Sequence, residues 1–355
     1  LRRQRQMCIR DRPYIIEVNE SLQTSSKIEI FLWNGTGSAP SSPQYTLSKA
    51  IPSSTNLQTL YDVSPYIREY IKFVTRPINY NTVGDALNSN FWCNVKIKRY
   101  KNTGTLLDTT TYYAFDGYTE YSQGYNYDRG KYLLDEGTYY YYYDSDSTST
   151  LTKAGDITLE VSSGDKVKHT NLVSGATNTA NFPSAGLKTI FRVYPTYWSS
   201  GCKTEILNSS NTVLRTYYFK PIEECKYTPL PIDYINKYGA WQREWFFKAS
   251  NQFFEMSNTE YNLLPQMLLN YNVLEGQKKT FNTNGTESIR VNTGWVNENF
   301  SNTIKEIMLS DRIILNDVPV KLKTKNIEQF KSINSKTINY QLEFDYTFYH
   351  VNNVI

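Results

Sequence analysis

The stretch Lys336 to Phe348, KTINYQLEFDYTF, decides the class of fold. Ile338, Tyr340, Leu342 and Phe344 alternate with polar residues along it, and this two-residue period is that of a β-strand with one apolar face. An apolar strand face has to be buried against a second layer of structure. We therefore expect this segment to lie in a sheet that other elements cover on one side.

The covering layer is predicted from the segment Asn297 to Leu309, NENFSNTIKEIML. Phe300, Ile304, Ile307 and Met308 recur at steps of three and four residues, so they fall on one stripe of an α-helix. We expect this helix to lie across the sheet, with Ile304 at the centre of the buried stripe.

Strand signals also dominate the rest of the chain. The segments Lys27 to Trp33 and Asn94 to Tyr100 alternate apolar and polar residues, whereas Ser64 and Pro65 are typical of the N-cap and first position of a short helix. After the polar run Asp144 to Thr150, several short strands lie between turn signals, which is the pattern of a small antiparallel sandwich.

The expected fold is mainly β, with two antiparallel β-sandwich-like domains followed by a β-rich C-terminal domain that has one amphipathic helix packed on a sheet. The expected boundaries are 1–12 for a non-native segment, 13–150 for the N-terminal β domain, 151–230 for the small β-sandwich domain and 231–355 for the C-terminal α+β domain.

The first twelve residues, LRRQRQMCIRDR, resemble a translated sequencing adapter. We expect the native chain to begin upstream of Pro13 and this segment to be dispensable for folding. It holds five arginines and one aspartate, so the other residues carry 38 − 5 = 33 basic and 34 − 1 = 33 acidic side chains. A neutral chain lacks the basic surface that binds nucleic acid, so no nucleic-acid partner is expected.

Few residues in the chain are typical of catalytic or metal sites. It has 31 tyrosines and two histidines, with no Walker, Rossmann or Ser-His-Asp motif. His169 and His350 have no second ligand or catalytic partner at a suitable spacing, and both are predicted to be strand-surface histidines. Asp144 and Asp146 occupy the first two acidic positions of a calcium loop, but the glycine and the distal glutamate are missing. We expect no catalytic residue, cofactor or metal site, and we predict that the protein is not an enzyme.

Cysteine usage and hydropathy add two further expectations. Cys93, Cys202 and Cys225 show no metal-ligand spacing, and reduced thiols fit a protein assembled in a host cytoplasm. A Cys202–Cys225 bridge across adjacent strands is the alternative. No apolar run approaches the ~18 residues of a membrane span, so no membrane partner is expected.

Two clusters of aromatic residues are the candidates for ligand or interface contacts. Such rings combine an apolar body with a polar tip, which suits both stacking on sugar rings and cross-strand pairing inside a core. The exposure of the rings distinguishes these two alternatives. The candidates are Tyr112, Tyr118, Tyr121, Tyr125 and Tyr127 in the first cluster and Trp241 and Trp245 in the second.

Several segments of the chain resemble one group of predicted virion proteins from the genomes of tailed bacteriophages in environmental and gut samples. The segments are YIIEVNESLQTSSKIEIFLWNGTGSAPSSPQYTLSKAIPSS (14–54), YYAFDGYTEYSQGYNY (112–127), GAWQREWFFKAS (239–250), FNTNGTESIRVNTGWVNENF (281–300) and SINSKTINYQLEFDYTFYHVNNVI (332–355). The similarity spans nearly the whole chain after Arg12, and none of its motifs marks a known active site.

The resemblance implies a structural component of the virion, in its tail, baseplate or connector, that is assembled in the host cytoplasm. Its expected partners are other virion proteins, with the chain acting as a homo-oligomer or ring subunit. The first alternative is a glycan-binding adhesin of the phage tail, with a host glycan as its partner. The second is a carbohydrate-active enzyme, which needs two carboxyl groups at a defined separation across a cleft.

Overall fold

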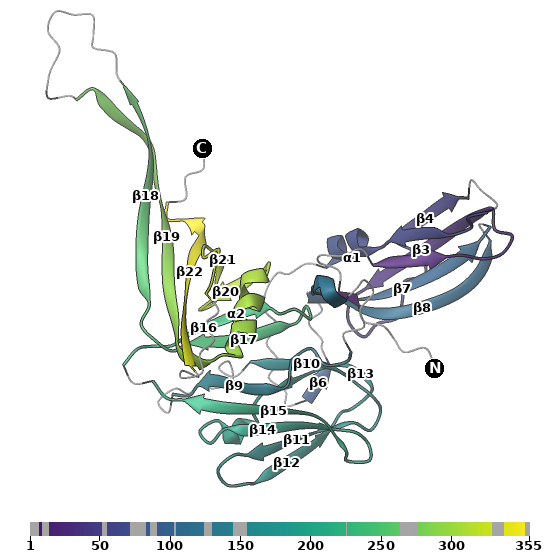
Figure 1. The fold of residues 1–355 in the computed structure, drawn as a ribbon, viewed down its shortest axis with the longest axis horizontal. Coiled ribbons are helices and arrows are strands. Elements are labelled where there is room, and N and C mark those ends of the chain that lie inside the picture. Colours follow the sequence, from purple (N-terminus) through teal and green to yellow (C-terminus); the bar gives the residue numbers. More distant parts are fainter. Residues whose placement is uncertain are drawn as a thin grey trace, which may run out of the picture. The chain divides into compact units, whose positions relative to one another are not determined.

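The computed structural model of the chain describes residues 7–8, 14–51, 55–71, 83–85, 91–102, 104–123, 130–144, 155–224, 226–262, 274, 276–328 and 337–351. Within these residues the chain is mainly β, with five sheets and two α-helices (Figure 1). They form two compact units, made of residues 1–224, 233–245 and 309–311 in unit 1 and of residues 225–232, 246–308 and 312–355 in unit 2. Neither of these helices has the length and apolar character needed to cross a membrane.

The first sheet of unit 1 has five strands in the order β1-β8-β7-β3-β4. They are β1 (Met7–Cys8), β3 (Ser25–Trp33), β4 (Tyr45–Ala50), β7 (Trp92–Lys101) and β8 (Thr105–Phe115). Ile30 and Leu32 of β3 pair with Ile97 and Val95 of β7, and all four side chains lie in one buried cluster. A two-stranded sheet of β2 (Ile15–Val18) and β5 (Thr59–Asp62), together with helix α1 (Ser64–Tyr70), contributes the other side of this cluster.

The other two sheets of unit 1 have the orders β10-β13-β6 and β12-β11-β14-β15-β9. Their strands are β6 (Val83–Asp85), β9 (Gly137–Tyr142), β10 (Asp156–Val161), β11 (Lys166–Asn171), β12 (Thr177–Asn181), β13 (Gly186–Phe191), β14 (Cys202–Leu207) and β15 (Val213–Ile222). Neighbours are antiparallel except for β15 and β9, which are parallel. Strands β6 and β9 precede residue 150, so segments far apart in the sequence complete these two sheets.

A seven-stranded sheet has the order β17-β16-β20-β21-β22-β19-β18. Its strands are β16 (Leu230–Ile235), β17 (Trp241–Phe246), β18 (Asn251–Asn262), β19 (Lys278–Asn297), β20 (Ile313–Leu315), β21 (Val318–Leu322) and β22 (Thr337–Tyr349). Strands β18 and β19 continue beyond the end of β22 (Figure 1).

The predicted amphipathic helix and the predicted strand with one apolar face are both present. The helix is α2 (Phe300–Leu309), and its Ile304 and Ile307 are fully buried. Leu342 and Phe344 of β22 are fully buried as well. The expected mainly β fold with one amphipathic helix packed on a sheet is therefore confirmed.

Candidate protein-contact surface

The tyrosines of the first predicted cluster lie in different environments. Tyr112 is half-buried and meets the core residue Tyr14 edge to face, with ring centroids 6.1 Å apart. Tyr118 is half-buried too, and its backbone N–H donates to the carbonyl of Lys237 at 2.8 Å. Tyr121 is 94% exposed, in the short 3-10 helix Tyr121–Gln123. Tyr125 and Tyr127 lie outside the described residues, so the described members do not form one surface.

The tryptophans of the second cluster are core residues. Trp241 and Trp245 are both buried in β17, and Trp245 packs against Tyr142 with ring centroids 5.7 Å apart. The polar residues between them are buried as well. Arg243 forms an ion pair with Asp233 of β16, with Nη2 2.6 Å from Oδ2. Both tryptophans are therefore packed inside the core, and the contact of Trp245 is with a strand of another sheet rather than with a cross-strand neighbour.

His169 is fully buried, so its prediction as a strand-surface histidine is wrong. Its Nδ1 lies 2.9 Å from Oγ1 of Thr204 and 3.6 Å from Sγ of Cys202, and its ring stacks on Tyr194. Burial lowers the pKa of His169 to about 4 and raises the pKa of the Cys202 thiol. Both groups are therefore neutral near pH 7, and this pair is part of the core rather than an activated nucleophile.

Among the other predicted groups, the structure describes Cys202, His350 and Asp144. Cys202 is a free thiol, so the alternative of a bridge to Cys225 is wrong; Cys225 itself lies outside the described residues. His350 is exposed as expected, with Nδ1 2.8 Å from Oε1 of Glu287. Asp144 is described but Asp146 is not, and in the described part of the chain no group of His, Cys, Asp and Glu is arranged to hold a metal ion.

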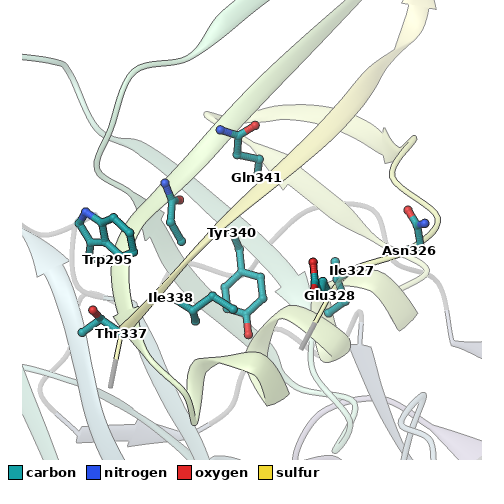
Figure 2. Close-up of a pocket in the computed structure, with 9 residues that line it drawn as sticks. Trp295, Asn326, Ile327, Glu328, Thr337, Ile338, Tyr340 and Gln341 are labelled. Carbon is teal, nitrogen blue, oxygen red and sulfur yellow. The ribbon is translucent and has the colours of Figure 1, made fainter. Parts of the chain in front are cut away.

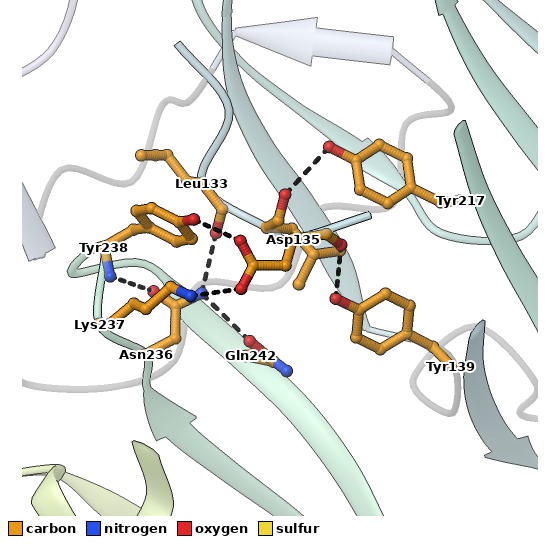
Figure 3. A network of polar contacts seen from close by, with 9 residues as sticks. Leu133, Asp135, Tyr139, Tyr217, Asn236, Lys237, Tyr238 and Gln242 are labelled. Atoms are coloured by element: carbon orange, nitrogen blue, oxygen red, sulfur yellow. Dashed lines mark hydrogen bonds and ion pairs between the residues drawn. The ribbon is translucent and has the colours of Figure 1, made fainter. Parts of the chain in front are cut away.

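A polar network in unit 1 holds the turn between β16 and β17 (Figure 3). Asn236 Nδ2 donates to the carbonyl of Leu133 at 2.8 Å and to Gln242, while its Oδ1 accepts from the backbone of the turn. The carboxylate of Asp135 accepts from both Lys237 Nζ and the Tyr238 hydroxyl. These polar groups bond to one another, so the network fixes the turn and is not arranged around a ligand.

Two glycines bring this turn close to the end of β8. A Cβ atom on Gly239 would lie 2.6 Å from the backbone N of Gly117 and 2.8 Å from Cβ of Phe115. Gly239 also has a φ of +81°, which L side chains rarely adopt. The close approach therefore requires glycine at this position.

A buried carboxyl group, Glu244, lies in β17 beside this network. Burial raises its pKa, against the lowering effects of Arg192 and of a hydrogen bond from Gln242 at 2.9 Å. The Arg192 guanidinium is itself buried; it donates to the carbonyl of Arg243 and lies 5.3 Å from the ring centroid of Tyr139. These contacts link Arg192, which directly follows β13, to β17, so Glu244 lies in a buried cluster of polar and charged side chains.

The most unusual surface of the chain is the antiparallel pair of β18 and β19, which we call the ribbon. All twelve residues of β18 are exposed, and β18 is the edge strand of its sheet. The ladder with β22 reaches only Thr286 of β19. Next to this point the N–H of His350 donates to the carbonyl of Gly285 at 2.8 Å and that of Val351 to Oδ1 of Asn284 at 3.1 Å. Among the described residues, the rest of the ribbon toward its tip is two-stranded, and isolated two-stranded ribbons are marginally stable in water.

Large apolar side chains lie on both faces of the ribbon. Phe254 covers Gly285, where an added Cβ would lie 2.2 Å from Cζ of the ring, and it contacts His350. Nearer the tip, Phe281 pairs with Thr259 and Tyr261 pairs with Lys279. The two rings therefore lie on one face as diagonal neighbours. The exposed apolar residues are Phe253, Phe254, Met256, Tyr261 and Phe281.

The ribbon carries charges of both signs in equal number. The acidic residues are Glu255, Glu260 and Glu287, and the basic residues are Lys278, Lys279 and Arg290. A surface that is apolar, unpaired along one edge and balanced in charge has the chemistry of a protein-contact surface. Comparisons with protein-family models and with curated proteins find no match to the chain.

Proposed function

We propose that the chain is a structural subunit of a tailed-phage virion, in the tail, baseplate or connector, and that it acts through protein–protein contact. The resemblance of its segments to virion proteins supports the location. The observation that carries the proposed mode of action is the ribbon, whose edge strand exposes twelve consecutive residues. Such an edge presents unpaired backbone groups and apolar side chains to a partner.

The partner that fits the ribbon is a second copy of the chain. The open edge of the ribbon is β18, and its exposed backbone groups are able to pair with β18 of a second copy. Outside residues 1–12 the chain has 33 basic and 33 acidic residues, so copies do not repel one another through net charge. Symmetric closure is the usual way in which identical chains satisfy such contacts.

The oligomeric state of the purified chain tests this contact. We expect sedimentation velocity to show a dimer or larger oligomer for the wild type and a monomer for the double variant Tyr261→Asp with Phe281→Asp. The matched control is Val213→Asp on β15, which also places a charge at an exposed apolar position but lies outside the ribbon. A wild type that stays monomeric at the highest soluble concentration would refute self-association through the ribbon.

The location in the particle needs a separate experiment. Mass spectrometry of purified virions should find the chain among the particle proteins at a copy number that matches a rotational symmetry. Its presence only in the lysate of infected cells would refute the structural role, whatever the oligomeric state of the isolated chain.

The glycan-binding and enzymatic alternatives have less support among the described residues. Of the predicted aromatic candidates, only Tyr121 presents a largely exposed ring there. Retention of the chain on host polysaccharide without cleavage would favour the adhesin. Release of reducing sugar that is lost when one carboxylate is replaced would favour the enzyme.

A further inference from the structure

A second surface of unit 2 lies along the outer edge of β22, the edge that faces away from β19. Strand β21 pairs with this edge from Tyr346 to Phe344. The backbone N–H groups of Lys323 and Thr324 then donate to the carbonyl of Glu343, at 2.8 and 3.3 Å. In the described part of the chain, no strand continues this ladder toward the start of β22.

The hydrogen bonds of the strand show which backbone groups point outward. The N–H of Tyr340 donates to Oγ1 of Thr293 on β19 at 3.0 Å, so Tyr340 faces β19. Backbone groups of successive strand residues point alternately to the two edges. Asn339 and Gln341 therefore direct their N–H and C=O groups away from β19, and neither residue has a hydrogen-bond partner along that edge among the described residues.

A pocket of about 550 Å³ lies along this open edge (Figure 2). Ile327 and Glu328 border one side, and Trp295 lies on the opposite side. Trp295 pairs with Asn339 across the β19–β22 ladder, and its side chain is 73% exposed. A large ring in this position is costly for an isolated protein surface and is typical of binding sites.

The lining of the pocket limits the chemistry of its occupant. Its single charged residue is the carboxylate Glu328, and no basic residue lines the described pocket. Phosphate and other anionic groups therefore have no counter-charge there. A cationic side chain is favoured by this carboxylate. Ile327 and Ile338 add apolar surface beside the edge.

We infer that the outer edge of β22 at Asn339 and Gln341 accepts an extended peptide strand of a partner protein, with apolar and basic side chains in alternation. The added strand occupies the place where a continuation of β21 would lie. Its backbone pairs with the outward groups of Asn339 and Gln341, as in other cases of strand addition to an open sheet edge. Its side chains lie beside Ile327, Ile338 and Glu328 at this edge, where the two isoleucines favour the apolar residues and Glu328 favours the basic ones.

Amide hydrogen exchange first tests whether the edge is open. In the free protein, the amides of Asn339 and Gln341 should exchange faster than that of Tyr340, which is bonded to Thr293. Equal protection of all three amides would show that the edge is already covered and would overturn the proposal. The variant with Tyr261→Asp and Phe281→Asp is used throughout, so failure of ribbon self-association does not affect the result.

Binding is then measured with a labelled synthetic peptide, TIKVKIT, by fluorescence anisotropy. The controls are its acidic analogue TIEVEIT and the same peptide N-methylated on alternate residues. Only the first peptide should bind and slow the exchange of Asn339 and Gln341. Equal binding of the N-methylated peptide would overturn strand addition, and equal binding of the acidic analogue would overturn the charge argument.

A matched pair of variants separates the backbone from the side chain. Asn339→Pro removes the outward N–H, and proline is tolerated where an edge N–H faces solvent. It should weaken TIKVKIT binding at least about tenfold, whereas Asn339→Ala should leave it nearly unchanged. Thermal unfolding establishes that both variants fold. Binding of chitohexaose that is lost in Trp295→Ala but kept in Asn339→Pro would make the pocket a glycan site and would overturn the proposal.

Discussion

The burial of His169 predicts that the stability of unit 1 depends on pH. The imidazole is fully buried, and its Nε2 has no hydrogen-bond partner in the described part of the chain. Its pKa is about 4 in the folded protein, against 6.5 for an exposed histidine. As the pH falls below 6.5, the unfolded chain binds a proton that the folded chain binds only near pH 4. The free energy of unfolding is therefore highest above pH 6.5 and falls with decreasing pH.

The size of this effect follows from the two pKa values. They differ by 6.5 − 4 = 2.5, which makes the loss about 3 kcal/mol at pH 4. His169→Gln does not titrate, and its side chain is able to bond to Thr204. We expect the wild type to lose about 3 kcal/mol relative to this variant between pH 7 and pH 4, as measured by urea unfolding at a series of pH values.

The comparison with a variant removes the contribution of the other titrating groups, because both proteins share them. Parallel curves for His169→Gln and the wild type would refute the reasoning, because they would mean that His169 takes up protons equally in the folded and unfolded states.

Three further substitutions test the packing and burial of residues within each unit. Ile304→Asp places an unpaired charge under α2 and should lower the free energy of unfolding of unit 2 by about 4 kcal/mol, measured by urea denaturation. Gly239→Ala forces a Cβ against the backbone of Gly117 and should cost at least about 2 kcal/mol more than Gly130→Ala in the same assay. Glu244→Gln should gain stability relative to the wild type as the pH rises above 4.5, measured by thermal unfolding, because burial raises the pKa of Glu244 and its ionised form opposes folding.

For each of these three predictions, one experimental outcome would contradict the reasoning. Cooperative unfolding of Ile304→Asp at the wild-type midpoint would show that the stripe of α2 is not core. Gly130 is the control for Gly239 because its φ of +78° is similar and nothing lies within 4 Å of its Cβ position. Equal costs at the two sites would mean that backbone strain, rather than the contact with Gly117, decides the result. A constant difference between Glu244→Gln and the wild type at all pH values would contradict the raised pKa.

The elements predicted best are those in which one face alone is buried. β22 and α2 lie within a few residues of their predicted bounds because their apolar residues follow the strand or helix period. The short helix after Val63 was also predicted, but with Ser64 as its N-cap. Ser64 instead lies inside the helix, and its Oγ accepts from the backbone of Tyr14 at 2.7 Å. A partner 50 residues away in the sequence is not visible in a local pattern.

The burial of His169 agrees with the strand period of its segment rather than with its residue type. β11 alternates outward and inward residues, and His169 falls on the same face as the buried Val167. The strand period therefore predicts a buried side chain at position 169, whereas histidine as a residue type suggests an exposed one. The pairing of β9 with β15 and of β6 with β13 was harder to predict, because these contacts join segments far apart in the chain and no local pattern specifies them.

Two consecutive strands, β17 and β18, show opposite patterns of burial: the first buries polar side chains and the second exposes apolar ones. β17 buries Gln242, Arg243 and Glu244, each with a polar partner, whereas β18 exposes phenylalanine and methionine side chains along its length. The first arrangement is stable within one chain because the polar groups satisfy one another. The second leaves apolar surface exposed on an edge strand, which favours association and lowers solubility. Such a ribbon is therefore explained more simply by a partner that covers it than by the stability of the isolated subunit.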